Sequence, residues 1–287
     1  MNFNRSGNKV EIYLTGGLGN QLFGWAAGYA LAIRLNVDLV LNTSNLWHRG
    51  YQLDSFADIN FRITETKHKY YDYSRPFEHR LISTIYRRTD FFQRGFGFDS
   101  RYSKINKPVG MHGFFQSYLY FKEELSIVRK MLENLRKPSQ KYLELSNLLS
   151  NINFTAVHVR RGDYTGKESH HGILEDEYYR RAMDLVGLRS SSEMLVVFTD
   201  DENESKKLIP GADLYVTNKI LESPAENLLI MSRAKNLLGA NSTFSLWAGF
   251  LAEENTLRTF PKPWFSREIP GEQDLMPTEY IRIPARL

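Results

Sequence analysis

The sequence predicts an α/β protein built on parallel sheets, in one large domain or two smaller ones. Its 287 residues suffice for either arrangement. Two patterns point to this class: the chain opens with a strand, a helix and a strand, and from residue 154 onward short apolar runs alternate with helical patterns. Strands separated by helices imply parallel pairing with right-handed crossovers, and such sheets bind ligands at the carboxyl ends of their strands.

The N-terminal part begins with an expected strand at Val10–Leu14 and a glycine-rich turn. The following helix, Gln21–Leu35, carries apolar residues at helical spacing: Leu22, Phe23, Trp25, Ala26, Tyr29, Ala30 and Ile33. Asn36 can end this helix. Val37–Leu41 then forms the second strand.

Residues Thr43–Lys107 are rich in Tyr, Phe, Arg and His and show little period. They fit a lid or an acceptor-binding region, and they fit equally well a set of irregular loops and short helices that cover the core. After them, Val109–Phe115 is expected as a strand and Tyr118–Arg136 as a helix that ends before Pro138.

The C-terminal part alternates cleanly. Expected strands are Phe154–Val159, Met194–Phe198, Ala212–Val216, Asn236–Ala240 and Leu257–Phe260, and expected helices are Glu175–Val186, Asn203–Leu208, Pro224–Ala234 and Phe244–Ala252. The polar stretch Ser139–Asn151 marks the division, so we predict domains over residues 1–145 and 146–287. The tail after Pro261 contains four further prolines, which predicts a chain that is extended or turns over the surface.

Composition excludes several classes of protein. There is no cysteine, so neither disulfides nor a thiolate metal site can hold the fold. The N-terminus lacks the apolar core of a signal peptide, no apolar run has the length of a membrane span, and no basic face suggests nucleic acid. We therefore expect a cytoplasmic protein. Its net charge of +4 gives at most a weak attraction to anionic substrates or to a membrane surface.

Two arginines follow the strand Phe154–Val159, in the run His158-Val159-Arg160-Arg161-Gly162-Asp163. His158 and Arg160 share one face of the strand and Arg161 lies on the other, so one guanidinium can reach a ligand while its neighbour braces the turn. Asp163 can accept from Arg161 or from backbone amides. Because the arginine fork matches phosphate oxygens, the pattern predicts a diphosphate at the strand end. The alternative is a surface cluster without a ligand.

Asp200 and Asp201 follow the next strand, in the run Phe198-Thr199-Asp200-Asp201. A carboxylate at this position can accept from a guanine edge, bind ribose hydroxyls or hold Mg²⁺ with a diphosphate. Alternatively, one of the pair caps the helix that begins near Asn203.

A third candidate is the segment Asn241-Ser242-Thr243-Phe244, where a strand ends and a helix begins. A helix N-terminus presents N–H groups and a positive dipole, which suits a phosphate. Ser242 and Thr243 add hydroxyl donors. An ordinary Ser/Thr cap is the alternative.

The turn Gly16-Gly17-Leu18-Gly19-Asn20-Gln21 matches neither the dinucleotide fingerprint nor the P-loop. It permits a close backbone approach, and Asn20 and Gln21 offer side-chain amides to a ligand.

Taken together, these segments resemble the glycosyltransferase family that contains the α-1,2-fucosyltransferases, glycosyltransferase family eleven. The resembling runs extend over most of the chain: Gly16–Phe23, Gly113–Ser117, His158–Tyr164, Phe198–Asp201 and Asn241–Trp247. The His-x-Arg-Arg-x-Asp run is shared with α-1,6- and protein O-fucosyltransferases, and the Gly-Gly-Leu-Gly-Asn-Gln opening narrows the resemblance to the α-1,2 group.

The resemblance implies a GT-B fold, in which two Rossmann-like domains face a cleft. GDP-fucose would lie mainly on the C-terminal domain and a galactose-containing acceptor on the N-terminal domain, with inverting transfer to the galactose 2-hydroxyl and no metal or other cofactor. Carried over by resemblance, Arg160 is the catalytic residue that grips the β-phosphate. The other donor-binding positions are His158 and Asp200 near the nucleoside, Asp163 beside the arginines, Ser242, Thr243 and Phe244 at the helix start, and Asn20 and Gln21 from the other domain.

No general base is evident; His171, Glu175 and Asp163 are the candidates. Other functions also fit the residues. The chain can be a nucleotide- or phosphate-binding module without transfer activity, a metal-dependent nucleotide enzyme that uses Asp200 and Asp201, or an interaction domain that binds a protein through its aromatic-rich middle.

Overall fold

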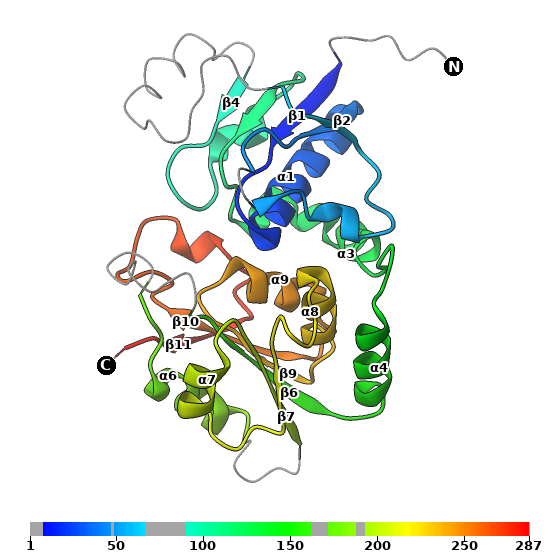
Figure 1. Ribbon diagram of the computed structural model, residues 1–287. Coiled ribbons are helices and arrows are strands. Elements are labelled where there is room, and N and C mark those ends of the chain that lie inside the picture. The colour runs from blue at the N-terminus through cyan, green and yellow to red at the C-terminus, as the bar shows by residue number, and fades with distance from the viewer. Residues whose placement is uncertain (1–7, 47–48, 67–89, 162–171, 188–192, 287) are drawn as a thin grey trace.

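The computed structural model describes residues 8–46, 49–66, 90–161, 172–187 and 193–286. It contains two parallel sheets, one in each half of the chain, with helices packed on them (Figure 1). The N-terminal sheet has the strand order β3-β2-β1-β5-β4, and the C-terminal sheet has the order β11-β10-β9-β6-β7-β8. The predicted α/β class with parallel pairing is confirmed.

The N-terminal half opens as expected, with β1 (Lys9–Tyr13), α1 (Leu18–Leu35) and β2 (Asp38–Asn42). Asn36 ends α1 in the left-handed conformation, with φ of 51°. The remaining strands are β3 (Arg62–Thr64), β4 (Asp90–Phe92) and β5 (Gly110–His112), and short 3₁₀ turns lie at η2 (Leu53–Ser55) and η3 (Ser100–Lys104). Within the described residues, the segment 43–107 therefore consists mainly of loops and short elements at the edges of the core.

The predicted helix Tyr118–Arg136 is wrong in its extent. The chain forms two 3₁₀ turns, η4 (Tyr118–Tyr120) and η5 (Lys122–Glu124), before the short helix α3 (Leu125–Met131). Tertiary contacts explain the difference, because Phe121 is fully buried and stacks on Trp247 at a ring distance of 5.3 Å. Its φ of −140° interrupts a continuous helix.

The C-terminal half contains all five predicted strands and all four predicted helices, with shifts of a few residues. The strands are β6 (Phe154–Val159), β7 (Met194–Thr199), β8 (Leu214–Val216), β9 (Asn236–Leu238) and β10 (Leu257–Lys262), and the helices are α6 (Asp176–Leu185), α7 (Glu202–Leu208), α8 (Pro224–Met231) and α9 (Thr243–Leu251). A further helix, α4 (Gln140–Leu149), occupies the polar stretch where we placed the domain division. It packs on the C-terminal half, since the Ser139 hydroxyl donates to Glu226 of α8 over 3.0 Å.

The tail is extended in part, which was one of the two expectations, but several of its residues do not lie on the surface. It ends in a strand that was not predicted, β11 (Ile281–Pro284), which pairs in parallel with β10. Trp264, Leu275 and Met276 are buried, because these apolar residues between the prolines complete the core. The prolines are tolerated since β11 is an edge strand.

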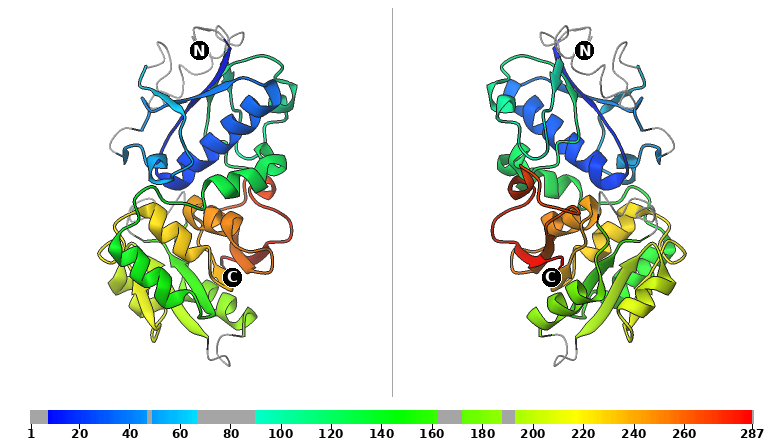
Figure 2. Two further views of the ribbon diagram at one scale, coloured as in Figure 1. Left: turned by 90° about the vertical axis from the view of Figure 1, so that its right-hand side faces the viewer. Right: turned by 90° about the vertical axis from the view of Figure 1, so that its left-hand side faces the viewer.

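The tail also joins the two halves. After Trp264 it rises from the C-terminal sheet toward the N-terminal half (Figures 1 and 2). There the hydroxyl of Ser117 donates to the carbonyl of Asp274 over 2.5 Å, and the ring of Phe265 meets that of Phe96 edge-on at 5.0 Å. The turn η7 (Glu272–Asp274) belongs to this crossing.

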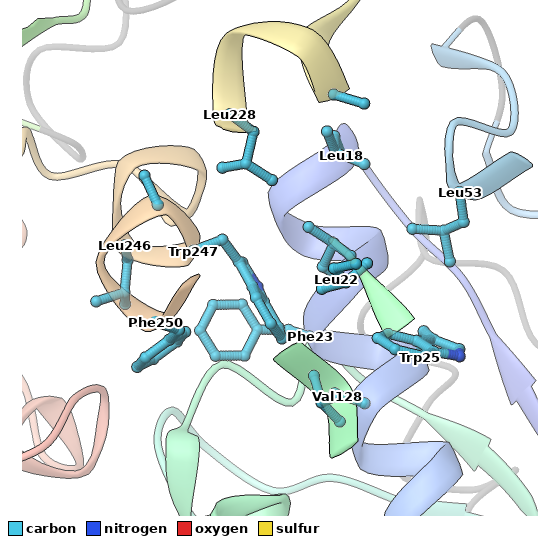
Figure 3. Packing of buried hydrophobic residues seen from close by; sticks show 14 of the residues in the cluster. Leu18, Leu22, Phe23, Trp25, Leu53, Val128, Leu228, Leu246, Trp247 and Phe250 are labelled. Carbon is cyan, nitrogen blue, oxygen red and sulfur yellow. The ribbon is translucent and has the colours of Figure 1, made fainter. Parts of the chain in front are cut away.

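A continuous apolar core lies between the halves. Phe23 of α1 packs against Trp247 and Phe250 of α9 at ring distances of 5.4 and 5.9 Å (Figure 3). At the start of both helices the approach is closer, because a Cβ on Gly19 would lie 2.7 Å from the backbone of Thr243 and Phe244. The first turns of α1 and α9 therefore face each other directly. None of the described helices has the length and apolar content needed to cross a membrane.

Candidate functional site

A cavity of about 440 Å³ lies at the carboxyl ends of the C-terminal strands, and residues of the N-terminal half line its other side. Seven of the nine predicted site residues line it: Asn20, His158, Arg160, Asp200, Ser242, Thr243 and Phe244. Gln21 does not line it, and Asp163 lies outside the described residues. Segments that are far apart in the sequence thus contribute to one site.

Arg160 and Asp200 form an ion pair in this cavity. The Nε atom of Arg160 lies 3.3 Å from Oδ2 of Asp200, and the other carboxylate oxygen accepts the backbone N–H of Arg161 over 2.8 Å. β6 and β7 are hydrogen-bonded neighbours, so their ends bring the two side chains together. Asp200 thereby fixes both the chain direction after β6 and the side from which Arg160 approaches the cavity.

Arg161 turns away from the cavity, as alternation along the strand predicts. It donates to the carbonyl of Leu174 over 2.6 Å, which ties the end of β6 to the segment before α6. Of the two arginines, Arg161 therefore has the structural role and stabilises the end of β6.

The start of α9 reaches the same cavity from β9, which neighbours β6 on the side opposite β7. Ser242 caps the helix, since its hydroxyl accepts the N–H of Phe244 over 3.3 Å. The Thr243 hydroxyl donates to Oδ1 of Asn20 over 2.9 Å. Both hydroxyls thus have protein partners, and the helix start favours an anion chiefly through its first-turn amides and its dipole.

Asn20 links the halves at the cavity wall. Its Oδ1 atom accepts from Thr243 and also from Nε2 of Gln116, over 2.8 Å. Gly16 has a φ of +69°, and a Cβ there would lie 2.5 Å from Nδ2 of Asn20, so this turn requires glycine.

The expectation that Gln21 binds the ligand is not supported by its position. Its side chain is fully buried and donates to the carbonyls of Gly16 and Gly50, both over 2.9 Å. Its Oε1 atom accepts the N–H of Gln52 over 3.0 Å. Gln21 therefore supports the two loops of the N-terminal wall from behind.

His158 is buried beneath the cavity and packs against the ring of Phe244 at 5.6 Å. Burial, with a smaller effect from the positive charge of Arg160, lowers the pKa of His158 to about 3. The imidazole is therefore neutral at physiological pH, where it can offer a hydrogen bond without adding charge.

The dependence of the unfolding free energy on pH should reflect the lowered pKa of His158. In the unfolded chain His158 titrates near its ordinary pKa of 6.5, and in the folded chain near 3. The unfolded state binds the extra proton between these values, so this group's contribution to stability is complete above 6.5 and is lost as the pH falls toward 3. His158→Phe should flatten the dependence of the unfolding free energy on pH, between about pH 4 and pH 6, by about 1.4 kcal/mol per pH unit. Urea titrations across this range measure the slope, and an unchanged slope would contradict the assignment.

The two aspartates of the run Thr199-Asp200-Asp201 have separate roles. Asp201 caps α7, since its carboxylate accepts the N–H of Glu204 over 3.1 Å, which is the alternative stated above. Asp200 is paired with Arg160. In the described part of the chain no group of three or more His, Cys, Asp or Glu side chains is placed to hold a metal ion.

Several lining residues were not predicted. They are Arg49, Gln52 and Gln116 from the N-terminal half and Asn218, Leu221, Glu222, Asn227, Trp264 and Phe265 from the C-terminal half. Gln116 lies in the run Gly113–Ser117 that carried part of the resemblance. Trp264 and Phe265 follow the last predicted strand, so the strand-end rule that identified Arg160 and Asp200 applies to them too. No sequence signal distinguishes Arg49.

Comparisons with known proteins find relatives in sequence and in fold. A family model described as Glycosyl transferase family 11 matches residues 4–283. An alpha-1,2-colitosyltransferase of Escherichia coli is 28% identical over 96% of this chain and 98% of its own. The O-antigen biosynthesis glycosyltransferase WbnK of Escherichia coli is 26% identical over 88% and 94%. The rat galactoside alpha-(1,2)-fucosyltransferase 2 is 30% identical over 47% of this chain and 40% of its own.

Among solved structures, the NodZ alpha-1,6-fucosyltransferase co-crystallized with GDP superposes with a TM-score of 0.51 at 15% identity, over 86% of this chain and 93% of that one. The fucosyltransferase NodZ from Bradyrhizobium gives a TM-score of 0.50 at 14% identity, over 86% and 94%. At such low identity the likeness concerns the fold, and it confirms the expected GT-B arrangement of two Rossmann-like halves.

Proposed function

Because the chain belongs to glycosyl transferase family 11, we propose that this glycosyltransferase moves L-fucose from GDP-fucose to the 2-hydroxyl of a galactose residue in a glycan, with inversion and without a metal ion. The observation that carries the proposal is the convergence of Arg160 and the start of α9 on one cavity, from the neighbouring strands β6 and β9. A guanidinium and a helix N-terminus together suit a diphosphate that bears a leaving group.

The proposed step is a single displacement. The acceptor oxygen forms a bond to the anomeric carbon of the sugar while the bond from that carbon to the β-phosphate oxygen breaks, and the electron pair leaves with GDP. Negative charge therefore grows on the β-phosphate, where Arg160 and the α9 amides stabilise it more strongly in the transition state than in the ground state.

The acceptor hydroxyl gives up its proton in this step, and none of the three candidates named for the base is a described residue that lines the cavity. Glu175 precedes α6 and does not line the cavity, while Asp163 and His171 lie outside the described residues.

The names of the relatives are compatible with more than one transferred sugar. Some carry the name fucosyltransferase and one the name colitosyltransferase, and colitose is a 6-deoxyhexose like fucose that lacks one more hydroxyl. The direct experiment incubates the protein with a panel of galactose-terminated glycans and either GDP-fucose or GDP-colitose, and reads the products by mass spectrometry with linkage analysis. A 2-linked fucosyl product supports the proposal; transfer of colitose alone, or linkage at another position, would correct it.

Calorimetry separates this function from the metal-dependent alternative. The proposal expects binding of GDP in preference to ADP and UDP, with an affinity that EDTA does not change. Loss of GDP binding in EDTA would favour a metal enzyme, although Asp201 caps α7 and Asp200 already pairs with Arg160. A protein with no nucleotide-dependent thermal shift would instead fit an interaction domain.

Asp200 offers a sharper test, because its carboxylate can serve in more than one way: it can accept hydrogen bonds from the guanine edge, or it can make other contacts such as the ion pair with Arg160. If Asp200 orients Arg160, Asp200→Asn should lower kcat on the order of 10-fold while the preference for GDP over ADP stays the same. If it reads the base, the same change should reduce that preference and leave kcat nearly intact. Steady-state kinetics and competition binding on one preparation distinguish these results.

The expected cytoplasmic location stays a prediction, which fractionation of the producing cells would check.

A further inference from the structure

We propose that Trp264 and Phe265 form the wall that receives the sugar of the nucleotide donor. This inference rests on the proposed function, since it assigns a subsite within the same cavity. It follows from the order of side chains along the edge of the C-terminal sheet, and from the chemistry at the two ends of that order.

The strand order fixes the positions. From one side to the other the edge runs β10, β9, β6, β7 and β8. Trp264 and Phe265 follow β10, the start of α9 follows β9, Arg160 follows β6, Asp200 follows β7 and Asn218 follows β8. All of these line the cavity.

The groups that attract phosphate lie in the middle of this row. Arg160 and the first turn of α9 are adjacent, because β6 and β9 are paired strands. In the proposed pose, the two substituents of a diphosphate held there extend along the edge, one toward β8 and the other toward β10.

The two ends of the row differ in chemistry. On the β8 side the lining includes Asn218 and Glu222, together with the buried Leu221. Polar acceptors and donors around an apolar surface suit a nucleobase, which has a hydrogen-bonding edge and flat faces. On the β10 side the lining residues are two aromatic rings. They suit a 6-deoxyhexose, whose methyl group and C–H face are apolar.

Phe265 is also held where the acceptor side closes the cavity. Its ring contacts Phe96 of the N-terminal half at 5.0 Å, and the next part of the tail is bonded to Ser117. Trp264 is buried, and its backbone N–H donates to the carboxylate of Glu272 over 2.7 Å, so the backbone of the wall is anchored. A sugar on this wall lies between the diphosphate and the N-terminal half, where an acceptor hydroxyl must approach.

The experiment compares GDP with GDP-fucose by calorimetry for the full-length protein and its variants. Phe265→Ala should weaken GDP-fucose binding by about 3- to 10-fold and leave GDP binding within about twofold of wild type. Phe265→Leu, which keeps an apolar side chain, should restore part of the loss. As the reciprocal variant, Glu222→Gln should weaken GDP and GDP-fucose by the same factor.

Equal losses for GDP and GDP-fucose in Phe265→Ala, or no loss for either, would overturn the assignment. So would a Glu222→Gln protein that is weakened toward GDP-fucose alone, because the donor would then lie in the opposite direction. Thermal denaturation shows whether Phe265→Ala folds. If it does not, binding of GDP and GDP-fucose is compared in Phe265→Leu, which should show a smaller loss for GDP-fucose alone. Failure of the wild-type protein to bind GDP at all refutes the proposed function and is thus distinguishable from failure of the subsite.

Discussion

Replacing Arg160 with alanine should lower kcat/KM for sugar transfer by about 100-fold or more. Arg160 lines the cavity beside the start of α9, and a preorganised donor to developing negative charge is typically worth about 2.7–4 kcal/mol in the transition state. Arg160→Lys should restore little, because an ammonium cannot both bond Asp200 through a fixed Nε position and present a planar fork to phosphate. Release of GDP in the presence of acceptor measures the rate.

Arg180 provides the matched control. It is an arginine paired with a carboxylate, Glu177, but on the exposed face of α6 and outside the cavity. Arg180→Ala should leave kcat/KM unchanged, since exposed ion pairs contribute little. Near-normal turnover in Arg160→Ala, with Arg180→Ala also normal, would remove Arg160 from the catalytic role.

Gly19→Ala should reduce activity on the order of 100-fold although the substitution adds only one methyl group. The new Cβ would lie 2.7 Å from backbone atoms of Thr243 and Phe244, so α1 and α9 must move apart. That movement displaces the amides at the α9 start and the bond from Thr243 to Asn20. A misplacement of about 1 Å can cost about 100-fold in rate.

Gly24→Ala is the control for this change. It lies in the same helix, and its added Cβ meets the nearest atom, Cδ2 of Leu14, at an ordinary 3.4 Å. Alanine also favours helix over glycine, so Gly24→Ala should keep activity and unfold at an equal or higher temperature. Activity retained in Gly19→Ala would show that the helix start tolerates displacement and does not position the diphosphate.

Much of the C-terminal half could be predicted because its signals are local. Apolar runs of strand length bounded by polar turns located β6, β7 and β9, and the strand-end rule located Arg160, Asp200 and the start of α9. The roles of Gln21 and of the Ser242 and Thr243 hydroxyls could not be read in this way. Side-chain amides and hydroxyls can form hydrogen bonds with the protein or with a ligand. Which of these partners each group has depends on the surrounding loops, and the local sequence does not show it.

The errors have a shared physical cause, which is the dominance of contacts between distant segments. The helix expected at Tyr118–Arg136 breaks because Phe121 packs on Trp247 across the two halves. The tail was expected to be extended or to turn over the surface because of its prolines. β11 is extended, but Trp264 and Met276 are buried by partners that the local pattern does not reveal. Arg49 lines the cavity from a segment whose sequence shows no periodic signal.

The contacts that the tail makes with the N-terminal half affect the order in which the parts of the protein fold. Asp274 meets Phe98 and Ser117 across 176 and 157 positions of sequence, and Thr243 meets Asn20 across 223. Such high contact order delays closure of the cavity relative to the formation of either sheet. During synthesis the N-terminal half leaves the ribosome first. Its side of the pocket stays exposed until the C-terminal half has been made and has folded against it.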